Sequence, residues 1–196
     1  TGVSFVFHKR WSNNWQMLAS YDYGRGYFEW GGIPSPNDVY NYRRQELYSS
    51  RPHMFRVTGN YLIAEPVGVN LGVFIRAQSG EPVKARYSYD DSVIEPPNGP
   101  WGRQTNTTIF VDAAGEGNTV GSVRPEREDF VTIVDLRAEK QVTIGRYGVL
   151  HFYFDVFNLF NANTVTEFRE WLGSRYGEIS DILPPRVLRI GGAWDF

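Results

Sequence analysis

Seven segments of the chain alternate apolar with polar residues, or run apolar with many β-branched and aromatic side chains, which is the pattern of β-strands. Each segment is nine to eleven residues long. A tilted strand needs this length to cross the hydrocarbon layer of a membrane, whereas strands of globular proteins more often have about five or six residues. The pattern therefore predicts long strands at Val3–Trp11, Trp15–Tyr23, Phe55–Ile63, Val69–Ala77, Val134–Ile144, Val149–Phe157 and Val187–Phe196.

The connections between these segments alternate strictly between short and long. The short ones are rich in Asn, Gly and Pro, as tight turns require: Ser12–Asn14, Ala64–Gly68 and Gly145–Gly148. The long ones are Gly24–Met54, Gln78–Ile133 and Asn158–Arg186. Outer-membrane barrels have short turns on one side and long loops on the other, whereas a soluble sandwich has no reason to place every long loop at one end. The alternation therefore favours consecutive antiparallel strands of a barrel.

Side-chain parity separates apolar from polar residues, because successive residues of a strand lie on opposite faces of the sheet. In the last segment, Leu188, Ile190, Gly192, Trp194 and Phe196 share one face, opposite Arg189 and Asp195. In 149–157, Leu150, Phe152, Phe154 and Val156 are opposite His151, Tyr153 and Asp155. Segment 134–144 separates in the same way, except that Lys140 falls on the apolar side. We expect the apolar side to contact lipid and the polar side to line a watery lumen.

The composition adds aromatic side chains to this picture and excludes several other classes of protein. Phe, Trp and Tyr make up 16% of the 196 residues, which suits strands and the boundary between water and lipid. Trp11, Trp15, Tyr21, Tyr23, Tyr61 and Trp194 lie near predicted strand ends, where an aromatic girdle is expected. The absence of cysteine excludes disulfides and thiolate metal sites. A net charge of -2 gives no basic surface for nucleic acid, and no apolar run approaches the roughly 18 residues of a transmembrane helix.

Motifs in the last third of the chain resemble those of a known family. Asp135–Lys140 reads DLRAEK, and after a short turn Phe154–Asn161 reads FDVFNLFN. With Pro184–Phe196, which ends in an aromatic residue, they resemble the closing strands of TonB-dependent outer-membrane receptors. Trp15–Tyr21, Arg51–His53 and Gln78–Pro82 also resemble barrels of this family, particularly variants with a carboxypeptidase-regulatory-like N-terminal domain. The resemblance covers most of the chain outside the long loops.

The resemblance implies an all-β fold in which residues 1–196 form an antiparallel meander of about seven long strands, the C-terminal part of a transmembrane β-barrel. The whole barrel would have about 22 strands and contain a plug domain, and we expect the plug and the earlier strands to be absent from this chain. The implied function is TonB-energised uptake of a scarce ligand such as a siderophore, an oligosaccharide or a peptide. The implied location is the outer membrane of a Gram-negative-type bacterium.

The same resemblance implies three partners: the lipid bilayer, the TonB system through the missing N-terminal part, and the outer-membrane assembly machinery. The assembly machinery would read a signal in the last strand, whose residues are Phe196, Trp194, Ile190 and Leu188. No nucleic-acid partner is expected.

No catalytic or metal-binding arrangement stands out, so we expect neither an enzyme nor a cofactor nor a metal site. His8, His53 and His151 are far apart and lack the spacing of a metal-binding helix. Asp112–Asn118 mixes carboxylates with glycines but lacks the alternating ligands of an EF-hand loop, so a solvated loop is favoured. There is no Gly-rich phosphate loop or nucleophile elbow.

Aromatic side chains of the long loops could grip a ligand from outside, or could pack on the rim. They are Trp101, Trp171, Tyr40, Tyr42, Tyr48 and Tyr176, with Arg43, Arg44, Arg103 and Arg175 nearby. The sequence does not single out any of them as a ligand-binding residue. Two other functions remain open: an outer-membrane barrel hydrolase, and a soluble β-sandwich that binds carbohydrate through its loops.

Overall fold

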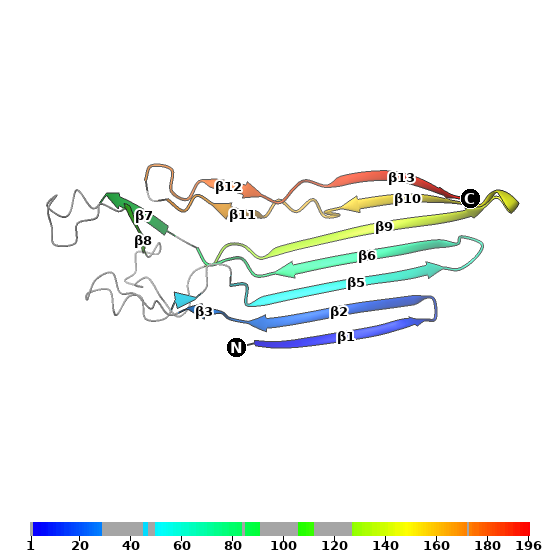
Figure 1. The fold of residues 1–196 in the computed structure, drawn as a ribbon, viewed down its shortest axis with the longest axis horizontal. Coiled ribbons are helices and arrows are strands. Elements are labelled where there is room, and N and C mark those ends of the chain that lie inside the picture. The colour runs from blue at the N-terminus through cyan, green and yellow to red at the C-terminus, as the bar shows by residue number, and fades with distance from the viewer. Residues whose placement is uncertain are drawn as a thin grey trace.

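The computed structural model describes residues 2–28, 45–46, 50–83, 85–90, 106–111, 127–171 and 173–196. Its main feature is a seven-stranded antiparallel sheet in which each strand pairs with its neighbours in chain order (Figure 1). The strands are β1 (Gly2–Ser12), β2 (Trp15–Gly24), β5 (His53–Ile63), β6 (Val69–Gln78), β9 (Val131–Thr143), β10 (Val149–Phe157) and β13 (Val187–Asp195). The predicted all-β meander of seven long strands is confirmed.

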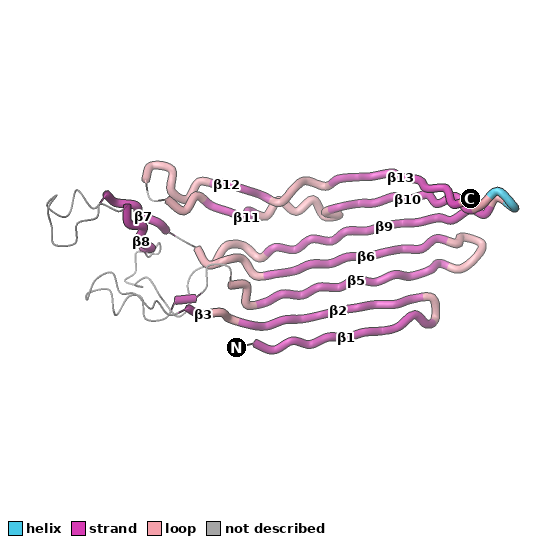
Figure 2. Tube along the Cα trace, viewed as in Figure 1, coloured by secondary structure: helices cyan, strands magenta, loops and turns pink. Residues whose placement is uncertain are grey.

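The three short turns lie together at one end of the sheet, as predicted (Figure 2). Asn13 and Asn14 both have positive φ, 52° and 66°, as expected for a two-residue turn that matches the twist of a hairpin. The β9–β10 turn contains a 3-10 helix, Gly145–Tyr147. At Gly148, with φ of 109°, an added Cβ would lie 1.9 Å from the Asp195 carbonyl oxygen, so this turn fits against the end of β13 only with glycine.

The long connections contain short hairpins that the sequence pattern did not predict. In the described residues, β3 (Tyr27–Phe28) pairs with β4 (Gln45–Glu46), β7 (Ala85–Asp90) with β8 (Asn106–Val111), and β11 (Val165–Phe168) with β12 (Ile179–Ile182). Two to six residues are too few for alternation to stand out from a loop. The hairpin β11–β12 continues the line of β10 and β13 beyond the sheet (Figure 1).

The sheet is a single layer without a hydrophobic core of its own. Among the described residues, the buried aliphatic side chains are Val57, Val131 and Leu183. The described parts of the chain contain no helix that is long and apolar enough to cross a membrane. Both edges of the sheet, β1 and β13, have only one neighbour each within the described residues.

Candidate functional site

One face of the sheet is apolar across all seven strands, because directly paired residues point to the same side. In the middle of the sheet, Phe7 pairs with Ala19, Ala19 with Val57, Val57 with Ile75, and Ile75 with Val134. Nearer β13, Ala138 pairs with Phe154, and Phe154 with Ile190. We call this surface the apolar face: Val3, Phe5, Phe7, Ala19, Tyr21, Phe55, Val57, Leu71, Val73, Ile75, Val134, Leu136, Ala138, Val142, Leu150, Phe152, Phe154, Val156, Leu188, Ile190 and Trp194.

The apolar face is open over much of its area. Phe152 is 53% exposed, Phe154 44%, Leu188 62% and Ile190 84%. The last two strands have the predicted parity, because Leu150 is paired with Trp194 and Val156 with Leu188, so these residues lie on the same face. A water-soluble monomer rarely leaves a contiguous apolar surface of more than a few hundred Å² uncovered, so the exposure of this face is unusual for such a protein.

Aromatic residues border the apolar face at both ends of the strands. At the end near the long loops, the Tyr21 hydroxyl and His53 Nδ1 are 2.9 Å apart, and the Tyr23 ring lies 5.1 Å from the His53 ring. At the end near the short turns, Trp15 pairs with Tyr61 across β2 and β5. We call these two groups of residues the aromatic belts.

The aromatic belts lie near opposite ends of the strands. Trp15 and Tyr23 are eight residues apart on β2, which is about 27 Å along a strand. A strand tilted by about 35–45°, as in a barrel, would span a height of roughly 20 Å over this length. Phe7 is paired with Ala19, midway between the two belts.

Lys140, the charged residue that the alternation placed on the apolar side, does lie on the apolar face. Its side chain points towards the short-turn end of the sheet. It is paired with Val69 and Phe152 and donates a hydrogen bond to the Val67 carbonyl. Lys9 behaves in the same way, which the sequence analysis missed. Its Nζ donates to Ser12 O at 2.9 Å, Ser12 Oγ at 2.7 Å and Trp15 O at 3.1 Å, and lies 3.9 Å from the Trp15 ring centre. Both lysines keep their charge at the level of the turns.

The opposite, polar face carries an ion-pair network centred on Asp155. Arg137 Nε donates to Asp155 Oδ1 at 2.6 Å, and Arg189 Nε donates to Oδ2 at 2.8 Å. Asp155 lies between them in the register of β9, β10 and β13 and is only 3% exposed. One carboxylate thus joins three strands, and Arg137, from the DLRAEK motif, points away from the apolar face.

A second polar cluster lies nearer the short turns on the same face. His151 Nδ1 is 3.1 Å from Glu139 Oε1, and His151 Nε2 is 3.0 Å from Asp195 Oδ2. Gln141 donates to the same Glu139 oxygen at 3.0 Å. This cluster also links β9, β10 and β13, so the polar face carries two groups of paired charges at this side of the sheet.

The NLFN residues, Asn158–Asn161, form a turn that follows β10 and contacts the segment just before β13. Asn158 is 7% exposed and has a positive φ of 51°. Its Nδ2 donates to Ala162 O at 2.9 Å and to Pro184 O at 2.8 Å, and its Oδ1 accepts from Ala162 N at 2.9 Å. Asn161 has a φ of 52°, and its Oδ1 accepts from Arg186 N at 2.9 Å, just before β13 begins. The two asparagines therefore place the start of β13.

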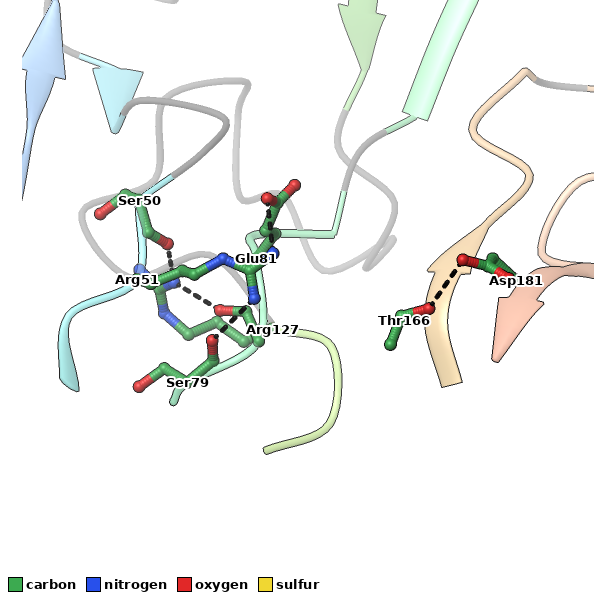
Figure 3. Close-up of polar contacts among 8 residues, drawn as sticks. Ser50, Arg51, Ser79, Glu81, Arg127, Thr166 and Asp181 are labelled. Carbon is green, nitrogen blue, oxygen red and sulfur yellow. Dashed lines mark hydrogen bonds and ion pairs between the residues drawn. The ribbon is translucent and has the colours of Figure 1, made fainter. Parts of the chain in front are cut away.

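At the long-loop end, two arginines tie the ends of the connections together (Figure 3). Arg51 donates to Glu81 Oε1 at 2.9 Å, and Arg127 donates to Ser50 O at 2.7 Å and Gly80 O at 3.1 Å. The segments that precede β5, follow β6 and precede β9 are thus joined by polar contacts. Farther along this end, Thr166 donates to Asp181 within the β11–β12 hairpin, at 3.3 Å (Figure 3).

The candidate ligand-contact residues are only partly described. Trp171 is exposed, and Arg175 is paired with Glu178 at 2.8 Å. Tyr176 lies with Phe168, Arg169 and Asp129 around a hollow between the β11–β12 hairpin and the start of β9. The remaining candidates lie outside the described residues: Tyr40, Tyr42, Tyr48, Trp101, Arg43, Arg44, Arg103 and the whole of Asp112–Asn118.

The residues proposed as an assembly signal lie along the open edge strand. Leu188, Ile190 and Trp194 share the apolar face of β13, while Phe196 follows the strand, which ends one residue earlier than predicted, and is 100% exposed. The Trp194 ring lies 5.6 Å from the Phe196 ring, and its Nε1 donates to Tyr147 O at 3.0 Å. Trp194 thereby fastens the edge strand to the β9–β10 turn.

The three histidines lie on three different strands, β1, β5 and β10. Within the described ranges, no group of three or more His, Cys, Asp or Glu side chains has the arrangement of a metal site. The structure thus brings together an apolar face with aromatic borders and a polar face whose charges on β9, β10 and β13 are paired. Compared with known proteins, the chain matches no protein-family model, no curated protein and no solved structure.

Proposed function

We propose that this chain is a segment of an outer-membrane β-barrel that takes up a scarce ligand. The single observation that carries the membrane placement is the apolar face, which is exposed, continuous over seven strands and bordered by aromatic belts. Lipid chains are the partner that such a face fits, because they cover an apolar surface without any matching shape. The opposite face, with the Asp155 network, then lines the lumen.

The barrel requires more strands than the described seven. The outer edges of β1 and β13 would leave unpaired backbone groups in lipid, and each such group costs several kcal/mol. We propose that further strands of a longer protein pair with both edges and close the barrel. A soluble β-sandwich is less favoured, because a sandwich buries one face of the sheet under a second sheet, and here the apolar face is open in the described residues.

The receptor function rests on the resemblance to TonB-dependent receptors and on the positions of the residues that carry it. In DLRAEK, Leu136 and Ala138 lie on the apolar face and Asp135, Arg137 and Glu139 on the polar face, as an amphipathic barrel strand requires. NLFN forms the turn that leads towards the loops. We therefore propose uptake of a siderophore, an oligosaccharide or a peptide, energised by the TonB system acting on an N-terminal plug.

The test is to express the full-length protein in a Gram-negative host and separate its membranes. We expect the protein in the outer-membrane fraction, with a gel mobility that changes on heating because a folded barrel resists detergent. We further expect uptake of the ligand to stop when TonB is deleted, while binding at the cell surface persists. Recovery in the soluble or inner-membrane fraction would reject the placement, and uptake independent of TonB would reject the energised mechanism.

We also propose that Leu188, Ile190, Trp194 and Phe196 act as the assembly signal. They form one exposed, apolar row on or next to an edge strand, which is accessible for pairing with an assembly factor. Deleting Phe196 removes at most one side chain's burial, roughly 1.5–3 kcal/mol, which a large barrel should tolerate. In the fractionation assay we expect the deletion to lower the inserted fraction at least several-fold. Insertion at the normal rate and yield would show that Phe196 is not recognised.

A further inference from the structure

The short-turn end of the sheet carries more positive than negative charge. Residues 9–15, 63–69 and 140–149, which contain the three turns, include Lys9, Arg10, Lys140 and Arg146 but only one carboxylate, Glu65, and a second carboxylate, Asp195, lies next to Val149 at the end of β13. Two of the four cations, Lys9 and Lys140, belong to strand positions on the apolar face, next to the proposed lipid. In the proposed barrel, the membrane leaflet at this end would therefore contact an apolar face that carries two cations, Lys9 and Lys140.

The two lysines differ in how many of their N–H donors form hydrogen bonds within the chain. An ammonium group has three N–H donors. Lys9 directs its donors at Ser12 O, Ser12 Oγ and Trp15 O, and its ammonium also lies over the Trp15 ring. Lys140 has one recorded acceptor among the described residues, the Val67 carbonyl. Two N–H donors of Lys140 are therefore left for a partner outside the sheet.

The surroundings of Lys140 define what that partner can be. Its pairing neighbours on β6 and β10, Val69 and Phe152, are apolar and would contact lipid chains. Glu65 lies near Lys140, because both side chains approach Gly68. A Cβ added to Gly68 would be 3.0 Å from Lys140 Nζ and 2.6 Å from Glu65 Oε1. No ion pair joins Lys140 to Glu65 in the described residues. A partner of Lys140 must thus combine an apolar body with a negative group at the level of the turns.

We propose that Lys140 binds the phosphate of an anionic phospholipid in the leaflet next to the short turns. The acyl chains would cover Val69 and Phe152, and the phosphate would accept hydrogen bonds from the two remaining N–H groups. The inference rests on the proposed membrane placement. Lys9, whose donors are already used, is the matched residue that should not select such a lipid.

The test places a fluorophore on the Phe152→Cys variant of the full-length protein, with any other cysteines replaced, in phosphatidylcholine vesicles. Phe152 is directly paired with Lys140, and this chain contributes no other cysteine, so the probe reports the lipid at this site. Quenching by brominated phosphatidylglycerol is compared with quenching by brominated phosphatidylcholine. We expect about fivefold local enrichment of phosphatidylglycerol, the preference that one lysine near an anionic lipid provides, decreasing with salt.

Three variants distinguish binding at Lys140 from a general attraction of anionic lipid to the positive charge at this end of the sheet. Lys140→Gln should abolish the enrichment, Lys9→Gln should leave it unchanged, and Glu65→Gln should increase it because a competing carboxylate is removed. Enrichment that survives Lys140→Gln, or that Lys9→Gln abolishes equally, would overturn the proposal but leave the membrane placement intact. No quenching by either lipid would show that Phe152 does not face lipid, and would overturn both.

Discussion

Replacing Asn158 with alanine is expected to lower the free energy of unfolding by about 3–5 kcal/mol. The substitution removes three hydrogen bonds from a buried side chain, each with a net contribution of about 1 kcal/mol. It also forces alanine into a left-handed conformation, at a φ of 51°, which costs about 1–2 kcal/mol more. The turn after β10 would lose its contact with Pro184, just before β13, so the edge strand should loosen first.

Denaturant unfolding of the full-length protein in vesicles measures this change. Asn158→Gly is the matched control, because glycine accepts the backbone conformation but lacks the side-chain bonds, so it should cost about 1–2 kcal/mol less than alanine. Asn161→Ala, which loses the single recorded bond to Arg186 N, should have a smaller effect. Equal stability of Asn158→Ala and the native protein would contradict the structural role assigned to this residue.

Phe7→Arg is expected to destabilise the membrane-inserted protein by about 2–4 kcal/mol, because it places a charge at the middle of the lipid-facing band. Phe7 lies midway between the aromatic belts and is 53% exposed in this sheet. Its chain neighbour Val6, on the polar face, is 67% exposed. Both side chains are exposed in this sheet. A difference between Phe7→Arg and Val6→Arg in the free energy of unfolding must therefore come from the surroundings of the sheet.

Val6→Arg is therefore the control for Phe7→Arg, and we expect it to change the free energy of unfolding by less than about 1 kcal/mol. Both variants are unfolded by denaturant from the same vesicles. A similar cost at both positions, or a larger cost at Val6, would contradict the assignment of the two faces.

The long strands could be predicted from the sequence because each runs for nine or more positions with apolar residues concentrated on one face, despite exceptions such as Lys9 and Lys140. This separation also predicted which residues share a face, and pairings such as Phe154 with Ile190 confirm it. The alternation has a physical reason: a one-residue shift in register would turn charges such as Arg189 to the apolar face. The hairpins of the long connections could not be predicted, since four residues such as Val165–Phe168 carry too little pattern.

The side-chain contacts of the candidate site were less predictable. The sequence placed Arg137, Asp155 and Arg189 on the polar face but could not show that one carboxylate joins all three strands, because that depends on the pairing register. Lys140 broke the pattern, and only the geometry of the neighbouring turn explains how its charge leaves the apolar face. The role of Asn158 depends on a positive φ and on contacts with Pro184, which lies 26 residues away.

A cysteine scan along β10 is the most direct measurement of the central claim, that one face of this sheet contacts lipid and the other water. This chain contains no cysteine, so each variant in a background without other cysteines carries a single thiol. In the full-length protein reconstituted in vesicles, we expect Cys substitutions at His151 and Tyr153 to react with a water-soluble maleimide. Those at Leu150, Phe152, Phe154 and Val156 should be protected from the reagent, and a probe attached to them in detergent before reconstitution should be quenched by brominated lipid. This alternation with a period of two would support the account, whereas uniform reactivity along β10, or protection of His151 and Tyr153 with reaction at Phe152 and Phe154, would contradict it.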